Sequence, residues 1–142
     1  MSEYATSNRT LNPFTAGGYF RATSIVLALV GVLGIVLAAI GQSRLLAFSD
    51  SGPGFLTLTF THSVVHLVLA AVAALLGFGS VAPNVTKAMA IIIGAVYGGL
   101  GILGFFVENP LGGSLALTLG LGGNLVHLLL GTLGVVAGFR GD

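Results

Sequence analysis

The sequence predicts an all-α membrane protein: a four-helix transmembrane bundle built from two parallel helical-hairpin repeats. Of its 142 residues, 55% are hydrophobic and only 6% are charged, with a mean hydropathy of +1.05. Soluble domains carry about 25% charged residues, so this composition is that of a chain in a bilayer. The apolar residues form four runs, and the second half of the chain echoes the first.

The first element is a polar tail, residues 1–21, rich in Ser, Thr and Asn. It precedes a transmembrane domain that covers residues 22–142. The first apolar run is long and has no short basic region before it, which favours an uncleaved first helix over a signal peptide.

The apolar runs are each long enough to cross ~30 Å of hydrocarbon as a helix, which takes about 20 residues. Backbone groups in lipid must bond within the chain, so helices are the expected structure. Pro53, Pro83 and Pro110 fall between the runs, where proline ends helices. The predicted helices are 22–41, 55–78, 88–107 and 115–139.

The positive charges are distributed unevenly about this topology. Arg9, Arg21, Lys87 and Arg140 lie on one side of the membrane, and Arg44 lies on the other. By the positive-inside rule, both termini are cytoplasmic, and the protein is a multi-pass protein of the inner or plasma membrane.

The internal repeat is clearest around two histidines. His66 lies 61 positions before His127, and the residues that follow each histidine are similar. A glycine-rich pattern at 31–35 recurs at 98–102. Each copy contains two helices and returns the chain to the same side, so the two hairpins are parallel.

A family resemblance rests on Arg21 before the first helix and on the run Asn124-Leu125-Val126-His127-Leu128-Leu129-Leu130-Gly131. These features resemble an uncharacterised family of four-helix integral membrane proteins, domain of unknown function 4383. The resemblance covers roughly residues 20–140. In the first copy Ser63 stands where the pattern has Asn. The resemblance implies the four-helix fold and no particular activity.

Small residues follow one face of several helices. Gly94 and Gly98 share a face of the third helix, and Gly134 lies on the face of the fourth that also holds Asn124 and His127. Such faces let helix backbones approach closely in lipid. A second hypothesis is that Gly131 and Ala70, each four residues after a histidine, provide clearance beside the rings for a flat cofactor.

Ionisable residues inside membranes are rare and face the bundle interior, so the histidines are candidates for a functional site. They allow several interpretations. They are structural if Ser63 and Asn124, three residues before each ring, supply hydrogen bonds. Alternatively, His66 and His127 are axial ligands of haem b or a chlorophyll-type pigment. A third hypothesis is a metal site with ligands from His62, His66 and Glu108. A proton or ion relay through the three histidines is a fourth.

Other function classes find little support. The chain has no Cys, and its net charge of +1 gives no basic surface for nucleic acid. No catalytic constellation is evident, which predicts a non-enzymatic protein. We therefore expect a structural or accessory subunit of a membrane complex, with the lipid bilayer and other membrane-protein subunits, or further copies of itself, as partners. A haem- or chlorophyll-binding bundle is the alternative, and a small transporter or channel is the second alternative.

Overall fold

The computed structural model of the chain describes residues 11–42, 44–47, 54–107 and 120–140. The described part contains four helices, each long and apolar enough to cross a membrane. The predicted four-helix bundle is confirmed, and the chain is a small multi-pass membrane protein. The elements in chain order are α1 (Ala16–Ala39), β1 (Arg44–Ala47), β2 (Gly54–Thr57), α2 (Phe60–Phe78), α3 (Pro83–Leu103) and α4 (Leu121–Arg140).

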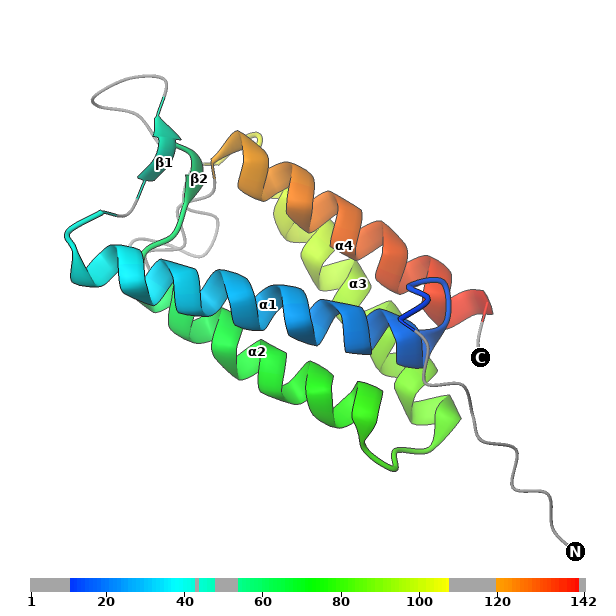
Figure 1. Cartoon of the computed structure of the whole chain (residues 1–142). Coiled ribbons are helices and arrows are strands. Elements are labelled where there is room, and N and C mark those ends of the chain that lie inside the picture. Colours follow the sequence, from blue (N-terminus) through cyan, green and yellow to red (C-terminus); the bar gives the residue numbers. More distant parts are fainter. Residues whose placement is uncertain (1–10, 43, 48–53, 108–119, 141–142) are drawn as a thin grey trace, which may run out of the picture.

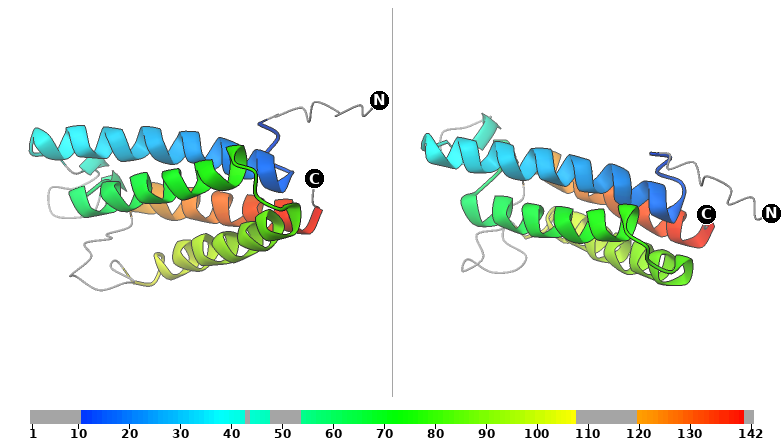
Figure 2. Two further views of the ribbon diagram at one scale, coloured as in Figure 1. Left: turned by 90° about the horizontal axis from the view of Figure 1, so that it is seen from below. Right: turned by 60° about the horizontal axis from the view of Figure 1, so that its bottom comes forward.

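The helices pack as two pairs, α1 with α2 and α3 with α4 (Figure 1). Between the pairs, α1 contacts both α3 and α4. The start of α1 and the end of α4 lie at one end of the bundle, and the short β-hairpin lies at the other (Figures 1 and 2). This pairing is the arrangement that two sequential helical hairpins predict.

The first helix begins six residues before its predicted start, inside residues 1–21, which the sequence predicts as a polar tail. Thr15 caps it: the Thr15 Oγ1 accepts a hydrogen bond of 3.1 Å from the Gly18 backbone N–H. Tyr19 and Phe20 are then almost completely buried. At the far end, Gly41 has φ +75°, and its N–H and that of Gln42 bond back to Ala38 and Leu37 as in a Schellman motif.

The predicted helix 55–78 is wrong for its first residues, which form β2 instead. This strand pairs antiparallel with β1, with Arg44 opposite Thr57 and Ala47 opposite Gly54. The helix starts only at Phe60, because the Thr59 side chain accepts a hydrogen bond from the His62 N–H and caps it. A four-residue strand inside an apolar run has no periodicity that separates it from a helix.

The other two helices also differ from their predicted bounds. The third begins at Pro83 rather than at residue 88, since proline is well suited to the first helical turn. It ends at Leu103 rather than 107. The fourth is helical from Leu121, and the predicted start at 115 lies outside the described residues.

Glycines bring each pair of helices into contact, Gly94 and Gly134 among them. A Cβ on Gly94 would lie 2.6 Å from the Val135 backbone nitrogen, and one on Gly134 would lie 2.9 Å from the Ala90 carbonyl oxygen. The nearest atom to a Cβ on Gly98 would be the Gly131 Cα at 4.0 Å. The α3 and α4 backbones therefore touch over several turns.

The two pairs also use similar contacts. A Cβ on Gly34 of α1 would overlap the Ser63 side chain of α2. A Cβ on Gly101 of α3 would lie 2.9 Å from the Asn124 carbonyl oxygen of α4. The predicted repeat aligns Gly34 with Gly101 and Ser63 with Asn124.

The end of the bundle opposite the hairpin is held by aromatic and basic side chains. Tyr19 and Phe20 belong to a core cluster with Ala90 and Ala137, which joins the start of α1 to the other pair. Arg21 Nη1 donates a 3.3 Å hydrogen bond to the Gly77 carbonyl in the last turn of α2. A cation at a helix C-terminus is favourable, because the exposed carbonyls carry partial negative charge.

The contact at Gly94 generates a stability prediction. Gly94→Leu inserts a side chain where the α4 backbone already lies, so we expect it to destabilise the bundle by about 1–3 kcal/mol or to part α3 from α4. The measurement is thermal unfolding in detergent, with Gly99→Leu as the matched control, because a Cβ on Gly99 meets nothing within 4 Å. Equal stability of both variants would contradict the packing role of Gly94.

Candidate metal centre

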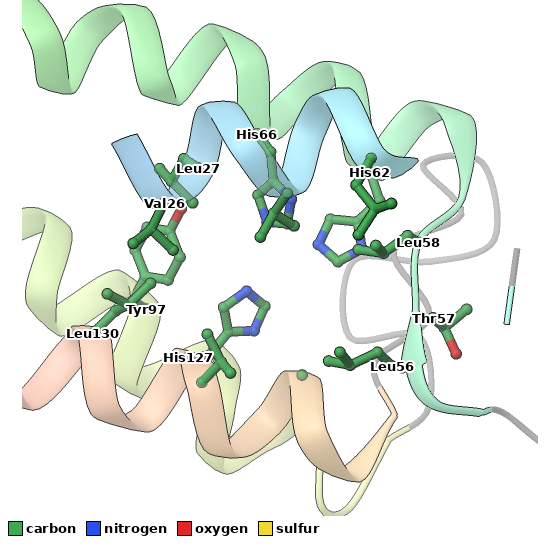
Figure 3. A pocket seen from close by; sticks show the side chains of 14 residues that line it. Val26, Leu27, Leu56, Thr57, Leu58, His62, His66, Tyr97, His127 and Leu130 are labelled. Carbon is green, nitrogen blue, oxygen red and sulfur yellow. The ribbon is translucent and has the colours of Figure 1, made fainter. Parts of the chain in front are cut away.

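Three buried histidines meet in the interior of the bundle. His62 and His66 lie one turn apart on α2, and His127 lies on α4. Figure 3 shows the two α2 rings and the α4 ring pointing toward one another from opposite sides of a cavity. Each histidine retains only 5–6% of its exposure. The ring centroids of His62 and His66 are 4.3 Å apart, and His127 is 6.1 Å from His62 and 6.5 Å from His66.

The ring nitrogens are close enough to share one ion. One nitrogen from each ring can be chosen so that all three lie within 4.8 Å of one another. Three imidazoles bound to one metal, with bonds of about 2.0–2.1 Å, place their nitrogens about 3.3–3.6 Å apart. The rings thus need to move together by about 1.5 Å at most, a shift within reach of small side-chain rotations.

The hydrogen bonding of the rings leaves one nitrogen of each histidine available. The Nδ1 atoms of His62, His66 and His127 are buried and have no hydrogen-bond partner in the described part of the chain. The ring N–H of His62 donates to the Thr57 backbone carbonyl. A bond of this kind commonly orients a metal-binding histidine and leaves its other nitrogen free for the ion.

The cavity beside the rings is small and apolar, with a volume of about 180 Å³. Residues of β2, the residue after it and Gly123 of α4 line part of the cavity. Its aliphatic walls are Val26, Leu27, Val30, Leu33, Leu56, Leu58, Val126 and Leu130. Such walls exclude water and hold the three rings in a medium of low dielectric constant.

Tyr97 of α3 completes the surroundings of His127. The two rings meet edge to face with centroids 5.2 Å apart. Tyr97 also packs with Leu27, Ala70 and Leu130 in a second core cluster. Its ring fixes the side of His127 that faces α3, which positions that imidazole toward α2.

The predicted hydrogen bonds from Ser63 and Asn124 to the histidines do not appear. Ser63 is fully buried, but its hydroxyl donates to the Thr59 carbonyl of its own helix at 2.8 Å. The Asn124 Oδ1 is buried without a partner in the described part of the chain and lies against Gly104, the residue that follows α3. Both side chains belong to helix interfaces, so neither satisfies a ring nitrogen.

The predicted macrocycle site does not fit either. The cavity is smaller than the ~300 Å³ at which pockets for drug-sized ligands begin, and a porphyrin is larger than such ligands. His62 lies beside both other rings, in the space that a macrocycle between His66 and His127 would need. Gly131 gives no clearance for a macrocycle, because a Cβ there would meet the Gly98 backbone. Ala70 gives none either, because it packs within the second core cluster.

The predicted metal site is closer to the observed arrangement, with one difference. His62 and His66 are together as expected, and the third imidazole comes from His127. Glu108 lies outside the described residues. The sequence held the signal for this set: His62 shares a helix face with His66, and the repeat places His66 opposite His127. Joining the two observations predicts all three rings in one place.

The depth of the site follows from the helix starts, and His66 and His127 do not lie at the middle of their helices. Because α2 starts at Phe60 and α4 at Leu121, each histidine is only six residues from its helix start. At 1.5 Å per residue this is about 9 Å. The cluster therefore lies in the part of the bundle nearer the β-hairpin.

Comparisons with protein-family models, curated proteins and solved structures find no match to this chain. The resemblance noted from the sequence stays a prediction.

Proposed function

We propose that this small membrane protein binds one transition-metal ion through His62, His66 and His127. The observation that carries the proposal is the convergence of three buried imidazoles, each with an unpartnered Nδ1, on one point between two helix pairs. Neutral imidazole is a common ligand of Zn, Cu, Fe and Ni ions.

The energetics favour a ligand over a purely structural cluster. A buried polar group without a hydrogen bond costs about 1–3 kcal/mol, and most such groups in proteins have partners. The cluster brings together three imidazoles that each carry such a nitrogen. One ion that accepts a lone pair from each ring would compensate all three at once.

The ion would also connect the two halves of the bundle directly. His62 and His66 belong to the α1–α2 pair, whereas His127 belongs to the α3–α4 pair. Among the described helices, α1 rather than α2 makes the main contacts between the pairs. A shared metal ion therefore adds a link between α2 and α4, and its binding energy stabilises the folded bundle.

The first test is metal binding by the purified protein in detergent. We expect one ion per chain and loss of binding in His62→Ala, His66→Ala and His127→Ala. Metal at 100 times its Kd should stabilise the fold by about 2.7 kcal/mol. Binding should weaken as the pH falls, because imidazole must be neutral to coordinate a metal. Metal content and thermal unfolding measure these effects.

The matched control for these variants is Asn124→Ala, which removes a buried polar group from the same face of α4, one turn from His127. It should keep the metal. If the wild-type protein binds no ion at either neutral or mildly alkaline pH, the proposed function is wrong.

For the orientation, we propose cytoplasmic termini in the inner or plasma membrane. Arg21, Lys87 and Arg140 lie near the starts of α1 and α3 and the end of α4, which share one end of the bundle. The metal centre would then lie toward the outer side of the membrane. The support is the positive-inside rule.

The absence of Cys allows a direct test of orientation. A single Cys placed at Ser80, an exposed residue between α2 and α3, should react with an impermeant thiol reagent only after the cells are opened. A Cys at Gln42, exposed after α1, should react in intact cells. The reverse pattern would contradict cytoplasmic termini.

A second candidate function, assembly with another membrane helix, has an observation of its own. The outer face of the α3–α4 pair carries an open groove of about 500 Å³ lined by small residues, among them Ala95, Gly98, Gly99 and Gly131. In lipid, grooves of small residues let a further helix approach closely. This fits the expected accessory subunit, with another subunit or a second copy as partner.

The groove generates its own prediction. Gly99→Leu fills open space on the outer face, so it should leave folding intact and lower self-association or subunit capture at least about tenfold. Crosslinking in native membranes measures the effect. Val96→Leu, exposed on α3 but absent from the groove lining, is the control. Unchanged crosslinking in Gly99→Leu would remove the groove from consideration.

A further inference from the structure

The electrostatics of the histidine cluster restrict the charge of its ion. Three neutral imidazoles contribute no negative charge. The cavity walls are aliphatic apart from the rings, Thr57 and Tyr97, and both hydroxyl groups are neutral. No Asp or Glu occurs anywhere in the described residues. The described part of the chain therefore leaves the charge of a bound ion uncompensated.

Desolvation makes this restriction strong. The cost of moving an ion from water into a medium of low dielectric constant grows with the square of its charge, so a divalent ion costs about four times as much as a monovalent one. Proteins that bind divalent ions in buried sites usually offset this cost with anionic ligands such as thiolates or carboxylates. The described residues around the cluster offer none.

We infer that the ion is monovalent copper, Cu(I), held by His62, His66 and His127 in a three-coordinate site. This inference rests on the proposed metal-binding function and goes beyond it by naming the ion. Among monovalent cations, Cu(I) is one that binds imidazole nitrogen well, whereas alkali-metal ions prefer oxygen ligands.

The number of ligands points the same way. Zn²⁺ in proteins is usually four-coordinate, so it would take a water from the adjoining cavity as a fourth ligand in addition to the three rings. Cu(I) accepts three ligands in a plane, with nitrogens about 3.5 Å apart at bond lengths of about 2.0 Å. The observed nitrogens, within 4.8 Å of one another, approach this arrangement without a further group. Cu(II), which prefers four or more ligands in a tetragonal arrangement, is disfavoured on both charge and geometry.

The test compares ions of different charge on the full-length protein in detergent. Cu(I) is supplied without oxygen, in the presence of a reductant and a competing chelator, and Ag(I) serves as a monovalent probe that does not change its oxidation state. We expect Cu(I) and Ag(I) to bind with one ion per chain and to compete. Zn²⁺ should bind at least about 100-fold more weakly than Cu(I).

The ligand set is tested on the wild-type protein, so that a folding defect cannot produce the result. X-ray absorption at the copper edge should show three nitrogen neighbours and the monovalent state. Glu108→Gln provides a second measurement: it should leave Cu(I) affinity unchanged, whereas a loss of tenfold or more would place an anion in the ligand set and overturn the inference.

The outcomes separate the inference from the function on which it rests. If Zn²⁺ or Cu(II) binds through the three histidines as tightly as Cu(I), the monovalent assignment is wrong and the metal-binding function stands. If no ion binds, both fall. Preferential Cu(I) binding that is lost in His127→Ala but kept in Asn124→Ala supports both.

Discussion

The close approach of helices at glycine is the constraint from which the rest of this structure follows. Apolar side chains gain nothing by leaving lipid for one another, so the helices associate through backbone contact and dispersion. Gly94 and Gly101 of α3 lie against the α4 backbone, and Gly34 of α1 lies against Ser63 of α2. Each hairpin is thus a tight unit. The space between the two units is less tightly filled, and the histidines and the cavity lie there.

Much of this arrangement could be predicted from the sequence, because it depends on periodicity. The spacing of small residues predicts Asn124, His127, Gly131 and Gly134 on one face of α4, and these residues are buried. The apolar runs located the helices. Both signals come from residues within a few turns of each other, and a helix converts such spacing directly into a shared face.

The parts that could not be predicted depend on contacts between distant segments. The start of α1 at Ala16 depends on the Thr15 cap and on the burial of Tyr19 and Phe20 against the other helix pair. The strand β2 exists because it pairs with β1 and packs on the start of α4, where Gly122 leaves room for the Phe55 ring. Neither contact leaves a periodic pattern in the chain. For the same reason, the sequence predicts hydrogen bonds from Ser63 and Asn124 to the histidines, although each side chain lies in the interface within its own helix pair.

The candidate site itself arises where the predicted repeat is broken. The repeat aligns His66 with His127, but it aligns His62 with Gly123. Two symmetric positions alone would have supplied two histidine ligands between the helix pairs. A histidine at position 123 as well would have supplied four ligands, and its side chain would have occupied part of the present cavity. With His62 on α2 and Gly123 on α4, the space between the two helix pairs contains three histidines and an apolar cavity of about 180 Å³ beside them. The asymmetry thus sets both the number of histidine nitrogens and the apolar space beside them, and the proposed choice of ion depends on both.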